Sequence, residues 1–288
     1  WSSDVCSSDL DQPEAHFNLG VARQAMGRGG EALASYEAAI ALRPDYLEAV
    51  YNRGVLLQDM ARQEDAIVAY DAVLQLNPYS VEALSNRGAA LHALKRYDES
   101  LSSYDKALAV QPAFVQTLHN RGLLLSEMGR HQDALASFDR ALALQPGHID
   151  ALTSRGKTLH ALGRLDEALT CYARALALQP GYPGALYSRA LTLRSLGRMD
   201  EALGSHDRAI ASAPNSPQMH YGRGVLLLEM GRLPEALSSY NHALALQPHF
   251  VPALKARAAL LTLAREYGAA ADDLQTLLRF APEMPYAL

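Results

Sequence analysis

Proline recurs through this sequence at one fixed interval, and that interval restricts the possible folds more than any other feature. Eight prolines stand 34 residues apart, without an insertion or deletion between them: Pro44, Pro78, Pro112, Pro146, Pro180, Pro214, Pro248 and Pro282. A constant period of this length is typical of repeat proteins, in which each repeat is one small unit that stacks on its neighbours. The chain therefore divides into repeats rather than into one or two globular domains.

Within each repeat the sequence predicts a helix, a turn and a second helix. Glycine is frequent where the first helix should end, because that position favours positive φ. These turn glycines are Gly27, Gly129, Gly163, Gly197 and Gly231. Proline follows the second helix and ends it, since proline lacks the amide proton that a helix needs. Acidic residues such as Asp166 and Glu167 are expected in the first turn of the second helices, where the helix dipole favours them.

Small residues recur at the eighth and twentieth positions of the repeat, and an aromatic ring recurs at the twenty-fourth. The eighth-position column is Gly20, Gly54, Gly88, Gly122, Gly156, Ala190, Gly224 and Ala258. The ring column includes Tyr36, Tyr70, Tyr104, Phe138, Tyr172 and Tyr240. We expect the small columns where two helix backbones approach closely, and the rings in an apolar stripe that faces the core.

This pattern resembles the tetratricopeptide repeat, a 34-residue unit with a small residue at position eight, Ala at twenty and twenty-seven, an aromatic at twenty-four and Pro at thirty-two. The resemblance implies an all-α fold, a right-handed superhelical solenoid of eight helix-turn-helix repeats whose first helices line the concave face. The middle repeats depart from the family at one first-helix position, where Leu replaces the usual aromatic. These residues are Leu84, Leu118, Leu152 and Leu186.

The repeats set the expected domain boundaries. The solenoid covers residues 13–284, as repeats 13–46, 47–80, 81–114, 115–148, 149–182, 183–216, 217–250 and 251–284. Residues 1–12 share no pattern with the repeats and are expected to be a non-repeat leader, either a sequence-assembly scar or a linker. Residues 285–288 are expected to begin a following segment that is truncated.

Composition excludes several classes of partner. The formal net charge is −5, and no apolar run approaches the roughly 20 residues of a bilayer-spanning helix. We therefore expect neither a nucleic-acid partner nor a membrane partner. The two cysteines, Cys6 and Cys171, are too few and too far apart for a disulfide framework, and they favour the reducing cytoplasm.

Patterns for catalysis and metal binding are missing from the sequence. Gly27, Gly29 and Gly30 lie in the turn between two helices, without the preceding strand that a dinucleotide-binding loop requires. The ten histidines are scattered without metal-ligand spacing, and we interpret them as surface residues. We interpret Cys171, beside Tyr172, as a small residue at the edge of the core. We therefore predict no catalytic residue, no metal site and no cofactor in this chain.

Asparagine occupies the sixth position in the first four repeats, at Asn18, Asn52, Asn86 and Asn120. The family resemblance places this position on the concave surface, where a row of carboxamides offers donors and acceptors to the backbone of an extended peptide. The row resembles the asparagine ladder in the superhelical domain of O-linked N-acetylglucosamine transferases. It fades in the last four repeats, to Ser154, Ser188, Gly222 and Ala256. In the alternative interpretation, the asparagines only satisfy neighbouring helices.

Two columns of arginine accompany the asparagines. The seventh-position column runs from Arg53 to Arg257, and Arg53, Arg87 and Arg121 are candidates for peptide contact beside the asparagines. The alternative is structural: their stems pack between repeats, and the guanidinium groups pair with nearby acids or carbonyls. The sixteenth-position column runs from Arg28 to Arg232 at the turn, where we expect it to complement the last carbonyls of the first helix.

These features predict a protein-interaction module that binds extended peptide or protein segments. The carboxylate-clamp subclass of the family is excluded, because no repeat combines its Lys at position five with its Asn at position nine. The ending from Phe280 to Leu288 resembles the junction at which bacterial proteins of the transferase family pass into a glycosyltransferase domain, and it also fits the start of a ninth repeat.

Two hypotheses of function follow. In the first, the chain is the substrate-recognition arm of an O-linked N-acetylglucosamine transferase-like (SPINDLY-type) glycosyltransferase, whose C-terminal catalytic domain lies beyond Leu288. In the alternative, it is a free-standing scaffold or adaptor with no linked catalytic activity. Both hypotheses make the chain a binding module for protein segments.

Overall fold

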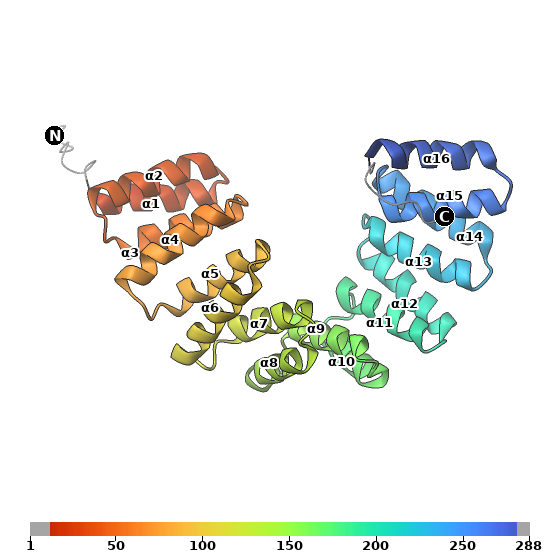
Figure 1. The fold of residues 1–288 in the computed structure, drawn as a ribbon, viewed down its shortest axis with the longest axis horizontal. Helices are drawn as coiled ribbons and strands as arrows, with labels where there is room; N and C mark the ends of the chain where they lie inside the picture. Colours follow the sequence, from red (N-terminus) through yellow and green to blue (C-terminus); the bar gives the residue numbers. More distant parts are fainter. Residues whose placement is uncertain (1–11, 281–288) are drawn as a thin grey trace, which may run out of the picture. The chain divides into compact units, whose positions relative to one another are not determined.

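The computed structural model describes residues 12–280, which form sixteen α-helices and no strand. They separate into two compact units, residues 12–145 and residues 146–280, and each unit contains four helix-turn-helix repeats (Figure 1). Several predictions fall outside the described residues: nearly all of the leader, the end of the eighth repeat with Pro282, the segment 285–288, and Cys6.

The helices pair regularly within each repeat. The first unit contains α1 (Pro13–Ala25), α2 (Gly29–Leu42), α3 (Leu47–Asp59), α4 (Gln63–Leu76), α5 (Val81–Ala93), α6 (Tyr97–Val110), α7 (Val115–Glu127) and α8 (His131–Leu144). The second unit contains α9 (Ile149–Ala161), α10 (Leu165–Leu178), α11 (Pro183–Ser195), α12 (Met199–Ser212), α13 (Pro217–Glu229), α14 (Leu233–Leu246), α15 (Val251–Leu263) and α16 (Tyr267–Phe280). The predicted all-α fold of eight helix-turn-helix repeats is confirmed.

The turn inside each repeat has the left-handed backbone that the sequence predicted. Gly27 has a φ of +73°, and the other four turn glycines adopt the same conformation. Ala61, Lys95 and Arg265 also adopt positive φ, at the same position of the remaining three repeats. All eight repeats therefore share one turn geometry, which glycine favours but does not strictly require.

Each second helix packs on the first helix of its own repeat and on the first helix of the next repeat in the same unit. Several consecutive first helices also contact each other: α3 with α5, α5 with α7, α9 with α11, and α13 with α15. The first helices of a unit therefore form one continuous surface, which we call the first-helix surface. The second helices of the unit pack against these first helices.

One contact recurs in six repeats, between the ring at position twenty-four and the glycine at position eight. A Cβ placed on Gly122 would lie 2.5 Å from Cε1 of Phe138, and one placed on Gly54 would lie 2.8 Å from Cε1 of Tyr70. Both rings are fully buried. The small column is thus explained by a ring packed on the glycine. The two helices also approach closely there, as expected: Ser100 Oγ of α6 donates to the carbonyl of Gly88 of α5 at 2.7 Å.

The two repeats with alanine in place of that glycine carry a different group in place of the tyrosine or phenylalanine ring. Ala190 shares its repeat with His206, and Ala258 shares its repeat with Leu274. The extra methyl group of alanine is compensated by a smaller partner, because a well-packed core tolerates exchanges that conserve volume. The two columns therefore vary together within this one chain.

The arginines at position sixteen have a different partner from the one we expected. Each is the N-cap residue of a second helix, and its guanidinium pairs with the acid three residues later. In α10, Arg164 Nε donates to Glu167 Oε1 at 2.7 Å, and this bond holds the pKa of Glu167 below its usual value. The arginines are structural, but they act on the start of the second helix rather than on the carbonyls of the first.

Replacing Gly122 by Ala should destabilise the protein by roughly 1–3 kcal/mol, because the added methyl group overlaps the Phe138 ring. Gly30→Ala is the matched control, since no atom lies within 4 Å of a Cβ built there. Urea unfolding measures both free energies. Adding Phe138→Leu to Gly122→Ala copies the Ala258–Leu274 pair. The double variant should therefore lose less unfolding free energy than the sum of the losses of the two single variants. A Gly122→Ala protein as stable as the parent would contradict the ring contact.

Candidate functional site

The four asparagines lie on α1, α3, α5 and α7, one on each first helix of the first unit. Asn18 is exposed, and the other three are half-buried. Asn86 Nδ2 donates to the hydroxyl of Tyr51, on the preceding first helix, at 2.9 Å. These positions put the whole predicted row on one first-helix surface.

Hydrogen bonds within the protein use some of the donors and acceptors of these asparagine side chains. The Asn52 side chain bonds to the Tyr36 hydroxyl, which partly opposes the rise that burial causes in the pKa of Tyr36. Asn120 Oδ1 accepts from Gln116 Nε2 at 3.0 Å. A carboxamide has two donors and two acceptor lone pairs, so one internal bond leaves donors or acceptors for a ligand. The internal bonds agree with the structural interpretation of the row, and its contact with a peptide stays a prediction.

Arg87 and Arg121 reach the second helices instead of the ladder. Arg87 Nε donates to Asp71 of α4 at 2.6 Å, and its Nη1 donates to Ser103 of α6 at 2.7 Å. Arg121 makes the two equivalent bonds one repeat later. Each guanidinium thus joins the second helix of its own repeat to that of the preceding repeat, as the structural alternative proposed.

Arg53 differs because Ala69 stands where most other repeats offer a serine. Its Nε is buried, and it has no hydrogen-bond partner among the described residues. In the second unit, Arg223 makes the complete pair of bonds, to Asp207 and Ser239. Direct contact of Arg53, Arg87 and Arg121 with a peptide stays a prediction.

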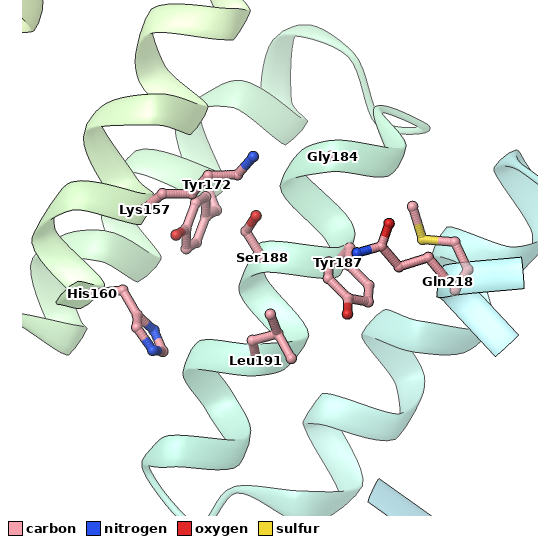
Figure 2. A pocket seen from close by; sticks show the side chains of 9 residues that line it. Lys157, His160, Tyr172, Gly184, Tyr187, Ser188, Leu191 and Gln218 are labelled. Carbon is pink, nitrogen blue, oxygen red and sulfur yellow. The ribbon is translucent and has the colours of Figure 1, made fainter. Parts of the chain in front are cut away.

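A pocket of about 340 Å³ opens on the first-helix surface of the second unit (Figure 2). Its walls come mainly from α9, α11 and α13. Figure 2 shows Ser188 and Leu191 in the middle, with His160 on one side and Tyr187 and Gln218 on the other. Sequence reasoning missed this pocket, and the available signal was a lysine among apolar residues at position nine of the repeat.

The pocket is mostly apolar, and some of its polar groups have partners within the protein while others have none among the described residues. His160 Nδ1 lies 2.7 Å from Thr192 Oγ1. Burial raises the pKa of Tyr187, whose ring packs edge-on against the ring of His206 with 5.6 Å between their centroids. Lys157 is exposed, and no hydrogen bond or ion pair within residues 12–280 engages its ammonium group.

His206 shows that the surface interpretation of the histidines was wrong for at least one of them. It is fully buried at the ring position of the sixth repeat, and neither ring nitrogen has a hydrogen-bond partner in the described part of the chain. Burial lowers its pKa to about 4, helped by Arg223 and Arg194 and opposed by Asp207. Its position, one full repeat after Tyr172, was the signal that places it in the core.

Other sequence predictions concern single residues and absent sites. Cys171 is buried and accepts a hydrogen bond from Arg155 Nη1 at 3.0 Å, which places it in the core beside Tyr172. In residues 12–280 no group of three or more His, Cys, Asp and Glu side chains is placed to hold a metal ion. None of the helices described for this chain is long and apolar enough to cross a membrane.

Family models described as tetratricopeptide repeat match the chain in consecutive stretches. The matched residues are 13–46, 47–80, 79–147, 113–181, 162–217, 187–249 and 221–285. Together these stretches leave no gap between residue 13 and residue 285. A search of curated protein sequences gave no match.

Solved structures match the chain at low sequence identity. A tetratricopeptide repeat protein from Parabacteroides merdae is 18% identical, with a TM-score of 0.71 over 87% of this chain and 98% of its own. YrrB, a TPR protein with an unusual peptide-binding site, is 24% identical, with a TM-score of 0.53 over 68% of this chain and 97% of its own. The structure of pilF from Pseudomonas aeruginosa is 18% identical, with a TM-score of 0.64 over 75% of this chain and 97% of its own. Likeness at these identities shows the fold alone.

His206→Leu should remove an acid sensitivity from the second unit. The folded-state pKa of about 4 lies below the usual value of about 6.5, so the stability that neutral His206 contributes is complete above pH 6.5. Below that pH the unfolded chain binds the proton first, and stability falls by up to about 1.4 kcal/mol per pH unit until about pH 4. Urea unfolding of both proteins at about pH 7.5 and pH 5 measures the difference.

Leucine copies Leu274, the residue that pairs with Ala258, so Ala190 can stay unchanged in this variant. His242→Gln, at an exposed histidine of the same unit, should leave the pH dependence of the parent intact. If the His206→Leu protein and the parent lose equal stability between the two pH values, His206 is not a neutral buried group.

Proposed function

The chain belongs to the tetratricopeptide repeat family, whose repeats form protein-interaction scaffolds, and we propose that its first-helix surface binds extended peptide or protein segments. The observation that carries the proposal is the row of asparagines on the first helices of the first unit: Asn18, Asn52, Asn86 and Asn120. An extended backbone offers N–H and C=O groups in regular alternation, and a carboxamide can serve either of them whatever the peptide sequence.

The arginines support this proposal as positioning residues. Arg87 lies next to Asn86 on α5 and bonds to the second helices on both sides, α4 and α6. Those bonds restrict how α5 can rotate between its neighbours. The asparagine beside each such arginine is therefore held at a fixed place, which lowers the ordering cost of binding.

We further propose that the bound segment is a substrate, presented in the cytoplasm to a glycosyltransferase domain of the O-linked N-acetylglucosamine transferase type. Its support is the resemblance of the asparagine row and of the Phe280–Leu288 ending to that family. The alternative is a free-standing scaffold. The replacement of asparagine after Asn120 favours it, because an asparagine ladder that serves a transferase should continue toward the catalytic domain.

Replacing Asn18, Asn52, Asn86 and Asn120 together by Ala should weaken peptide capture by about tenfold or more. Each lost hydrogen bond contributes about 0.5–1.5 kcal/mol, and several are lost at once. The readout is the affinity for peptides that the parent protein selects from a random twelve-residue library. Far-UV circular dichroism should show unchanged helicity, since the asparagines lie at the surface and are not helix caps.

The matched control removes four amides that lie away from the first helices. Gln111, Gln145, Gln179 and Gln247 are exposed at the ends of second helices, and their joint replacement by Ala should leave capture unchanged. Equal capture by the asparagine variant and the parent would leave the row with a structural role only.

Reading the source DNA beyond Leu288 separates the two finer alternatives. A following two-lobed domain of alternating strands and helices would support the transferase arm. A further 34-residue repeat or a capping helix before a stop codon would contradict it and favour the scaffold.

A further inference from the structure

The pocket of the second unit lies where three columns of the repeat change together. The ninth position is apolar in every repeat but the fifth, as Val21, Val55, Ala89, Leu123, Lys157, Leu191, Val225 and Ala259. The second position is acidic in the first three repeats and in the fifth, at Asp150, and it is uncharged in the sixth and seventh, at Gly184 and Gln218. The sixth position changes from asparagine to Ser188 and Gly222. Lys157, Gly184, Ser188 and Gln218 all line the pocket.

Loss of the asparagine changes what stands between neighbouring first helices. In the first unit, Asn86 occupies that space and bonds to the Tyr51 hydroxyl. The equivalent tyrosine of the second unit, Tyr187, faces Gly222, where a Cβ would lie 2.7 Å from its Cε2 atom. The Tyr187 ring therefore takes the room of the missing carboxamide and becomes one wall of the pocket, opposite His160 (Figure 2).

Charge also distinguishes this pocket from its counterpart in the first unit. There, a depression of about 350 Å³ is lined by Tyr51 together with Glu48 and Glu82. The pocket of the second unit has no acidic lining residue, and its charged residue is Lys157, whose ammonium has no partner within residues 12–280. An acidic group is therefore repelled by the first depression and attracted by the second.

We propose that this pocket holds one large apolar side chain of an extended partner peptide, with an adjacent acidic residue of the peptide paired to Lys157. Leu191 and the ring of Tyr187 supply apolar walls, and the exposed Gln218 offers hydrogen bonds to the peptide backbone. The inference rests on the proposed function and adds the class of peptide. Lys157, Tyr187 and Leu191 are then the residues that set specificity.

The test is selection from a random twelve-residue peptide library on the full chain, followed by anisotropy with the most enriched peptide. Enriched sequences should share Phe, Tyr, Trp or Leu beside Asp or Glu. Replacing the apolar residue by Ser should weaken binding roughly 10- to 100-fold, because a buried side chain of this size gains about 1.5–3 kcal/mol. Replacing the acidic residue by Ser should weaken it about two- to fivefold, and less at high salt, as for an exposed ion pair.

Two variants of the protein make the assignment specific. Lys157→Glu should reverse the charge preference, so that Lys or Arg replaces Asp or Glu in the enriched peptides. Ser188→Asn restores the residue found in the first four repeats, which fits the fold, and should remove the preference for a large apolar side chain. Lys106→Glu makes the same charge change at an exposed lysine of α6 and should leave the selected pattern unchanged.

Each remaining outcome overturns the proposal in a recognisable way. Selected peptides without the apolar–acidic pattern, or with that pattern unchanged by Lys157→Glu, overturn the pocket assignment and leave peptide binding intact. Failure of the parent to select any peptide overturns both the pocket and the proposed function. Concentration-dependent self-association that Lys157→Glu abolishes identifies a second copy of the chain as the occupant and overturns the peptide assignment.

Discussion

A single contact underlies the rest of the structure: in six of the eight repeats, the aromatic ring of the second helix packs on a glycine of its own first helix. It recurs from Gly20 with Tyr36 to Gly224 with Tyr240. One repeat cannot bury its apolar face alone, so this contact fixes the helix pair that then stacks on its neighbours. Where the glycine becomes Ala190, the ring becomes His206, and the helix pair is kept together with a buried imidazole that has no hydrogen bond within residues 12–280.

The first and second helices built on this contact have different roles. Arginines at position seven join successive second helices, as Arg87 and Arg223 do. The first helices keep their outer positions free for variation. In the first unit that variation produced a row of carboxamides, and in the second unit it produced an apolar pocket beside Lys157. Two surfaces of different chemistry therefore arise from one repeated frame.

Much of the fold could be predicted from the sequence because the same residue types recur at the same positions of each repeat. The period predicted the helices and turns, and the pattern of Gly27 and its equivalents predicted the positive φ. The partners of the arginines could not be predicted, because Glu167 and the carbonyls of the preceding helix lie equally near Arg164 in sequence. The pocket was missed because it depends on side chains from three repeats and on a ring displaced onto Gly222. His206 was predicted to lie at the surface because histidine is usually a surface residue, although its position in the ring column indicated the core.

Hydrogen exchange of the full chain, with and without a peptide selected by it, tests most directly whether the first-helix surface is the binding surface. Amide exchange slows where a ligand suppresses local opening. Protection should appear in first helices, and for a peptide seated in the pocket it should be strongest in α9, α11 and α13. Protection confined to second helices such as α10 and α12, with the first helices unchanged, would contradict a binding role for this surface.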